Sequence, residues 1–184
     1  MLIHLYMGDH NSYFPPATTN NQGYVVTLAA YMPTIDVQAT NNVFVSPSAA
    51  FPCHTYGNMN FTYAVHNGLF GGSEQSPVKL TAVTRPSEVI MMANGSQIPE
   101  YGYSCAFTFY NPWQLNQGDG QYAANELDTP IPCDPSTNVD NDAGMGYLRY
   151  VQAKNTAINV LMVDGHVQTI PMGQVLYRNV VYDQ

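Results

Sequence analysis

The chain has 184 residues, of which 45% are hydrophobic, so it can form one domain with a sizeable core and is too apolar to be disordered. Charged residues make up only 10%, against roughly 25% in an ordinary soluble domain, and neutral polar residues and tyrosines replace them, as is typical of exported proteins. The net charge is −8 with only 5 Lys and Arg residues, which argues against binding to nucleic acid or to an anionic membrane surface.

The N-terminal part of the chain predicts short helices before the first strand. Residues 1–8 are apolar from the start and predict the last turns of a helix whose beginning lies outside this chain. Residues 24–32 predict a short buried helix that stops before Pro33, because proline cannot continue a helix. Residues 43–45 predict a strand that enters a turn at 46–48.

The middle of the chain predicts strands separated by loops. Residues 56–65 are aromatic and rich in Asn, which favours a strand over a helix, and 68–77 predict a loop of Gly and Ser. Residues 78–83 predict a short strand or turn. Residues 89–93 predict a buried strand that the Asn94-Gly95 turn closes.

Residues 96–146 show little periodicity and are dominated by Pro, Gly, Asn and Asp. A structureless loop of this length is improbable inside a compact domain, so we expect an insertion with short strands of its own. A C-terminal sheet segment, 147–184, follows. It starts with a strand at 147–151 and ends with a strand at 175–181.

An Asp-Gly pair joins two β-rich runs near the C-terminus, 158–163 and 166–170. This pattern predicts an antiparallel hairpin with a type I′ turn, in which both central residues, Asp164 and Gly165, have a positive φ. A helix end followed by antiparallel strands predicts an α+β fold in a single domain, 1–184. We expect His166 to be a surface or cross-strand packing residue.

Asn159, on the strand before this turn, is expected to bond a neighbouring backbone group. Three cysteines, Cys53, Cys105 and Cys133, lack the CxxC spacing of a zinc site. They are consistent either with one disulfide and one thiol or with three buried thiols.

An acidic loop within the insertion is a candidate calcium site. Its oxygen-bearing side chains stand near alternate positions, as hard cations require: Asp134, Asn138, Asp140 and Asp142. The loop lacks the Gly and closing Glu of an EF-hand, and a purely solvated loop is the alternative. Asp119 and Glu126 could join the site if the insertion folds back.

Two further sets of residues fit other classes of function, a sugar-binding site and a hydrolase site. Trp113 and Tyr110 lie beside Asn and Asp and could stack on a sugar, while packing of a long loop onto the sheet is the alternative. A metal-dependent hydrolase site would combine histidines with a carboxylate. The candidates for that site are His54, His66, His166 and Asp164. The sequence has none of the usual hydrolase or phosphate-binding motifs.

The chain resembles the type II secretion-like pseudopilins that carry the prepilin-type processing-associated H-X9-DG signature, a family abundant in planctomycetes and verrucomicrobia. The matching segments follow the family's order: 5–16, 43–48, 56–60, 85–90 and 159–167. The last contains the motif residues Asn159, Asp164, Gly165 and His166. The chain departs from the family at Lys154, where the signature has His, and at Ser46, where a Cys is usual. The family's leader and apolar helix lie outside this sequence.

The resemblance implies a pilin-like fold, in which an N-terminal helix packs on an antiparallel sheet, and a non-catalytic function. The chain would be the soluble head of a subunit that the preceding helix anchors in the inner membrane before assembly with other pseudopilins and secretion machinery. Its location would be the cell envelope, periplasmic or at the surface, and the family's calcium site favours calcium in the acidic loop. The alternatives are a surface-displayed carbohydrate-binding or adhesin module and, third, a metal-dependent hydrolase.

Overall fold

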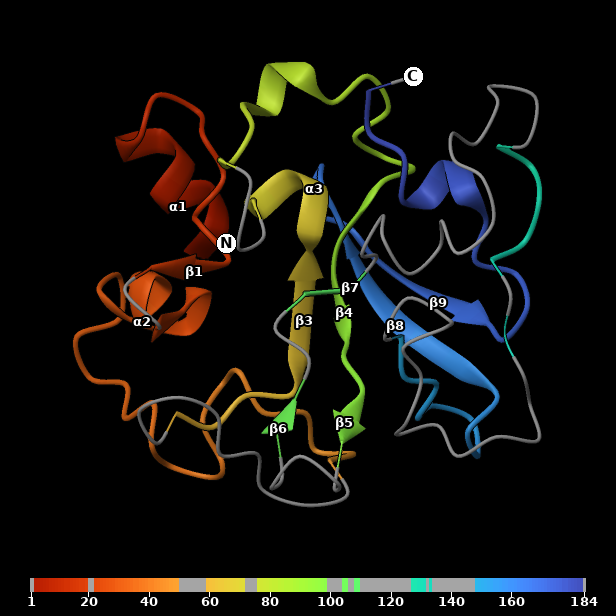
Figure 1. Ribbon diagram of the computed structural model, residues 1–184. Coiled ribbons are helices and arrows are strands. Elements are labelled where there is room, and N and C mark those ends of the chain that lie inside the picture. Colours follow the sequence, from red (N-terminus) through yellow and green to blue (C-terminus); the bar gives the residue numbers. More distant parts are fainter. Residues whose placement is uncertain are drawn as a thin grey trace.

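The computed structural model is an α+β fold, as predicted, with a five-stranded sheet in the order β7-β3-β4-β8-β9 (Figure 1). The strands span Tyr63–His66 (β3), Ile90–Asn94 (β4), Thr108–Phe109 (β7), Ala157–Met162 (β8) and Val167–Pro171 (β9). The structure describes residues 2–19, 22–49, 59–71, 76–98, 104–105, 108–109, 127–131, 133 and 148–183.

Helices α1 (Leu2–Asp9) and α2 (Tyr24–Ala29) lie to the left of the sheet in Figure 1, and the 3-10 helix η5 (Tyr177–Asn179, dark blue) lies at the upper right of the view. Both α-helices confirm the helices predicted at 1–8 and 24–32. The other elements are α3 (Asn67–Phe70), the 3-10 helix η1 (Leu80–Ala82), and the strand pairs β1–β2 (Thr18–Thr19, Gln22–Gly23) and β5–β6 (Gln97–Ile98, Ser104–Cys105). Within the described part of the chain, no helix is both long and apolar enough to span a membrane.

The sheet is mixed. Neighbouring strands run antiparallel from β3 to β9, whereas β7 pairs with β3 in parallel. The prediction of a wholly antiparallel sheet is therefore wrong at this edge, because β7 belongs to the 96–146 insertion and returns beside β3 in the same direction. The presence of β5, β6 and β7 confirms that the insertion holds short strands. The β8–β9 hairpin is confirmed within a residue of its predicted bounds.

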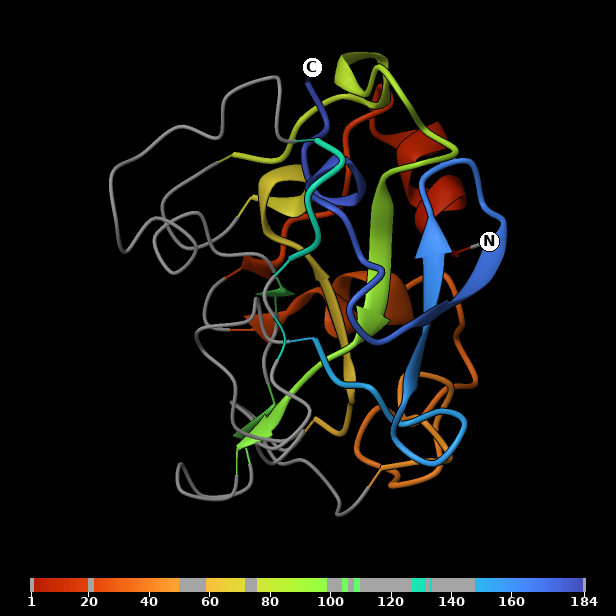
Figure 2. The same ribbon diagram turned by 90° about the vertical axis from the view of Figure 1, so that its right-hand side faces the viewer.

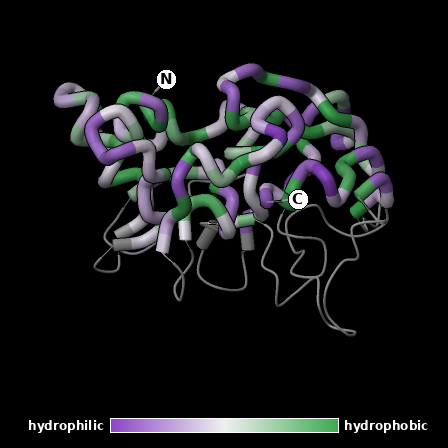
Figure 3. The backbone as a smooth tube through the Cα atoms, turned by 90° about the horizontal axis from the view of Figure 1, so that it is seen from above, coloured by the Kyte–Doolittle hydropathy of each residue, from purple (hydrophilic) through white to green (hydrophobic). Residues whose placement is uncertain are grey.

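Hydrophobic side chains form one core on each side of the sheet. Seen from above, hydrophobic and hydrophilic stretches alternate along the chain (Figure 3). Alternation along β8 sends Val160 and Met162 into one core and leaves Leu161 on the helix side. In β4 the register shifts between Ile90 and Met92, so an extra residue locally bends the strand. The continuous apolar run at 89–93 is thus explained by burial on both faces.

The helix-side core is built around aromatic rings. Tyr24, at the start of α2, has no exposed surface, and its ring centroid lies 6.0 to 6.4 Å from those of Phe44, Phe61 and Phe70. All three contacts are edge-on, a favoured geometry for aromatic pairs. These rings join α2, α3 and the segments before β3 into one layer.

The strand predicted at 43–45 is wrong, because the Asn42 side chain folds this segment into turns. Its amide nitrogen donates to the carbonyl oxygens of Ala39 and Asn60, at 2.8 and 2.9 Å, and its oxygen accepts from the Phe44 N–H at 2.7 Å. A side chain that satisfies these backbone groups replaces a sheet ladder. Phe44 is nevertheless buried.

Both flanking strands predicted for the C-terminal sheet segment are also wrong. Among residues 148–151, the part of this segment that the structure describes, only Leu148 forms a bridge, with Gly95. In 175–181 the chain forms η5, because the Asn179 oxygen accepts from the Leu176 N–H at 2.8 Å and closes a tight turn.

His66 links the end of β3 to the C-terminal segment. Its buried ring accepts at Nδ1 from the Gly68 and Leu69 N–H groups, at 3.0 and 3.2 Å, and donates from Nε2 to the Val180 carbonyl at 2.8 Å. This cap starts α3, so the loop predicted at 68–77 is wrong at its beginning. Burial lowers the pKa of His66 to about 4, although its hydrogen bonds act in the opposite direction.

We expect the free energy of unfolding to decrease as the pH falls from 6.5 towards about 4, the window between the ordinary and the folded pKa of His66. In this window unfolded His66 binds a proton that the folded protein excludes, so the stabilisation present above pH 6.5 is progressively lost. The full effect is about 3 kcal/mol.

Urea unfolding at a series of pH values measures this dependence. His66→Asn keeps an acceptor for the α3 cap and should flatten this part of the curve. His10 is exposed, so His10→Asn is the matched control and should leave the pH dependence of the unfolding free energy unchanged. An unchanged slope in His66→Asn would contradict the assignment.

Candidate functional site

The turn between β8 and β9 contains the motif residues and has a different geometry from the one predicted. The Gly165 N–H donates to the Met162 carbonyl and the Met162 N–H donates to the His166 carbonyl, both at 2.9 Å. Only Gly165 has a positive φ, +95°, while that of Asp164 is not positive. This is a type I turn followed by a left-handed glycine. The predicted type I′ turn is wrong because the loop has three residues.

Asp164 and His166 close this turn with their side chains. The Asp164 Oδ1 accepts from the His166 backbone N–H at 3.1 Å and from its Nδ1 at 2.7 Å. The bond from the backbone N–H is the main cause that lowers the pKa of Asp164. Both side chains are exposed at the surface, as predicted for His166. These hydrogen bonds explain the Asp-Gly-His sequence as a set of residues that forms the turn.

The turn also forms hydrogen bonds with two segments that are distant in the sequence. The N–H groups of Val163 and Asp164 donate to the carbonyls of Val89 and Pro86, each at 3.0 Å. The Val163 carbonyl in turn accepts from His4 Nε2 at 3.1 Å, and Figure 2 shows the turn beside α1. The helix α1 and the segments 85–90 and 159–167 therefore meet at this turn.

Two other signature positions have separate roles. Asn159 does not bond a backbone group as predicted. Its Oδ1 accepts from the hydroxyl of its cross-strand partner Thr169 at 2.7 Å. Lys154, at the position of the signature His, is exposed with a φ of +63° in the loop before β8. All of β8 separates Lys154 from Asp164, so these signature positions do not form one site.

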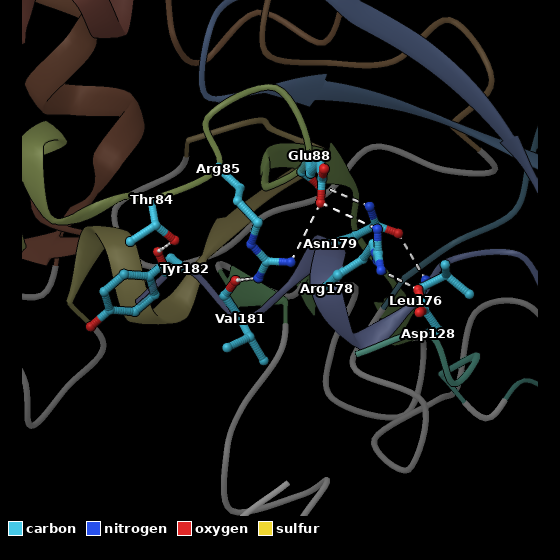
Figure 4. Close-up of polar contacts among 9 residues, drawn as sticks. All are labelled: Thr84, Arg85, Glu88, Asp128, Leu176, Arg178, Asn179, Val181 and Tyr182. Carbon is cyan, nitrogen blue, oxygen red and sulfur yellow. Dashed lines mark hydrogen bonds and ion pairs between the residues drawn. The ribbon is translucent and has the colours of Figure 1, made fainter. Parts of the chain in front are cut away.

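Ion pairs fix the C-terminal segment to the same 85–88 turn (Figure 4). Glu88 lies 3.4 Å from the Arg85 guanidinium and 3.7 Å from that of Arg178, which also pairs with Asp128. Arg85 donates a further hydrogen bond to the Val181 carbonyl at 2.9 Å. Exposed pairs contribute little one by one, but a shared network restrains the geometry of its members.

An apolar groove of about 510 Å³ lies beside the start of α1. The side chains that define it come from α1, from α2 and the turn after it, from the loop before β3, and from the β8–β9 hairpin: Leu2, Leu28, Met32, Val43, Leu161 and Val167. None of the described residues that line it is charged. Val43 and Val167 are 58% and 70% exposed, so the groove is an apolar surface open to solvent.

The groove exists because α1 covers only part of the helix-side face of the sheet. Its eight residues form a helix about 12 Å long. The first turn of α1 contributes Leu2 and Ile3 to the lining and the last turn contributes nothing, so the groove lies at the N-terminal end of the helix. This groove could not be predicted from the sequence, since Leu161 and Val167 follow ordinary strand alternation.

Most of the other predicted site residues lie outside the described part of the chain: Asp119, Glu126, Asp134, Asn138, Asp140, Asp142, Tyr110, Trp113, His54 and Cys53. Calcium binding by the acidic loop stays a prediction. Among the described residues, no group of three or more His, Cys, Asp or Glu side chains could hold a metal ion. Of the remaining cysteines, Cys105 lies in β6 and Cys133 is half-buried near Gly173.

Comparison of the chain with protein-family models, with curated proteins and with solved structures gave no match.

We expect Gly165→Ala to lower the melting temperature, because a Cβ is strained at a φ of +95° and would lie 3.4 Å from His4 Cε1. The cost of a left-handed conformation is about 1–2 kcal/mol for a residue with a side chain. Gly8→Ala is the matched control. Its Cβ would meet nothing within 4 Å, and alanine in α1 should stabilise the protein. Gly165→Ala melting at or above the wild-type temperature would contradict the turn geometry.

Proposed function

We propose that this chain is the head of a pseudopilin-like subunit that assembles into a type II secretion or type IV pilus-like filament and has no catalytic role. The observation that carries the proposal is the uncharged groove at the N-terminal end of α1. Its natural occupant is an apolar helix that precedes α1 and continues along the sheet. The α+β architecture, with α1 on one face of the sheet, is compatible with a pilin-like head.

The contacts around α1 support a rigid connection between such a helix and the sheet. Ile3 and Met7 are 3% exposed and pack into the helix-side core, while His4 holds the carbonyl of Val163. Displacing α1 would therefore break both apolar packing and a hydrogen bond to the β8–β9 turn. A filament subunit needs this rigidity, because its head has to follow the helix that joins its neighbours.

The proposed partners are other pseudopilin subunits and the secretion machinery, and the proposed location is the cell envelope. The preceding helix would hold the subunit in the inner membrane before assembly. In the filament it would pack partly in the groove of its own head and partly against neighbouring helices. Burial of apolar surface would provide about 25 cal/mol per Å² at each of these contacts.

The groove is tested with the full-length gene product in its source cells, by measuring the subunit in the sheared filament fraction. Val167→Glu should lower this amount about tenfold, since a charge in an apolar contact costs more than about 1.4 kcal/mol. Gln168→Glu is the matched control on the same strand. It adds the same charge on the opposite face of β9 and should assemble normally.

The melting temperature separates a defect in assembly from a defect in folding. Both purified head variants should keep the wild-type melting temperature, because Val167 and Gln168 are exposed. Finding the wild-type subunit only as a free monomer, with no apolar helix ahead of Leu2 in the mature protein, would overturn the proposal.

A further inference from the structure

A second depression, of about 480 Å³, lies at the C-terminal end of α1, at the other end of this helix from the groove. It is an open depression of the surface and not an enclosed cavity. Aromatic rings and polar groups share its lining: Tyr6, His10 and Tyr13, with Asp9, Asn11 and Ser76. The assembly proposal does not use any of these residues except through the fold of α1.

The rings of this depression are held in place by their neighbours. Tyr6 and His10 stack with their centroids 3.9 Å apart and an angle of 11° between the rings. Tyr31 packs edge-on against Tyr6, at 6.0 Å. A pair fixed in this way offers a rigid wall and loses little freedom when a ligand binds.

Tyr13 forms another part of the wall and is 43% exposed. Lys79 Nζ lies 5.0 Å from the centroid of its ring, a cation–π contact. Lys79 is not among the lining residues, so it fixes the ring without filling the depression. Its charge also disfavours a cationic ligand beside Tyr13.

The loop that contains Asn11 has an energetically unfavourable backbone conformation. Asn11 and Ser12 have φ values of +52° and +66°, and hydrogen bonds at 2.8 Å hold Ser12 to Met7 and Leu80. Left-handed residues other than glycine are unfavourable, and they cluster where function requires a fixed geometry. Here the conformation places the exposed Asn11 beside Asp9 and Tyr13.

We propose that this depression binds a neutral saccharide unit. A pyranose ring has an apolar face that would pack on Tyr13 and a rim of hydroxyl groups that would bond Asp9, Asn11 and Ser76. The carboxylate of Asp9 and the net charge of −8 disfavour an anion. The Asp9 carboxylate contacts the Tyr31 side chain, and a wholly apolar ligand would remove the rest of Asp9 and Asn11 from water without adding hydrogen-bond partners, which is unfavourable.

Calorimetric titration of the whole chain with cellotriose, chitotriose, xylotriose and mannotriose tests the proposal. We expect at least one trisaccharide to bind with a Kd of about 1 mM or tighter, and Asp9→Asn to weaken it about tenfold. Tyr13→Ala should abolish binding, whereas Tyr13→Phe, which keeps the ring, should retain it. Gln168→Ala, on β9, should bind as the wild type does.

Two further probes separate the ligand classes. Tetramethylammonium chloride represents a cation and sodium phosphate an anion, and neither should bind. The proposal is overturned if no trisaccharide binds at about 10 mM, if either ion binds instead, or if Tyr13→Ala and Asp9→Asn bind the sugars as tightly as the wild type. These outcomes do not depend on filament assembly, so the two proposals can fail separately.

Discussion

The hydrogen bonds of the β8–β9 turn are the constraint on which the arrangement of the other elements depends. The amides of Val163 and Asp164 reach the carbonyls of Val89 and Pro86, and the carbonyl of Val163 receives the ring of His4. Each such bond adds only about 1 kcal/mol, but leaving its groups unpaired in the core would cost more. The turn therefore fixes α1 and the segment before β4 relative to the hairpin.

Among the described residues, the ion pairs of Arg85 and Arg178 lie away from the groove. Two arginines, Arg85 and Arg178, converge on Glu88 and tie the C-terminal segment to the 85–88 turn. The groove beside α1 is lined without a charge. This separation leaves an apolar surface next to a helix that is well anchored, which is the combination that the assembly proposal requires.

Sequence patterns correctly predicted the elements that are determined by residues close together in the chain. The hairpin follows from alternation on both sides of Asp164-Gly165, and α2 follows from an apolar run that a proline ends. The errors at 43–45 and 175–181 share another cause. Side chains of Asn42 and Asn179 there bond the Asn60 and Glu88 carbonyls, which the sequence alone does not bring near. The groove was unpredictable for a similar reason, since exposure of Val167 depends on how far α1 extends over the sheet.

The order of the strands has a consequence for how the chain reaches this structure. β8 and β9 are joined by a short turn and can pair as soon as both exist, whereas β4 and β8 are neighbours separated by residues 95–156. Closing so long a loop has an entropic cost that the first contacts must overcome, and non-local pairing of this kind slows folding. Until β4 arrives, the hairpin exposes Met162 and Ile158, side chains that the finished core buries completely or nearly so. The β8–β9 hairpin comes after β4 in the chain, so the core side chains of this sheet stay exposed to aggregation until the C-terminal part has been synthesised and has paired with β4.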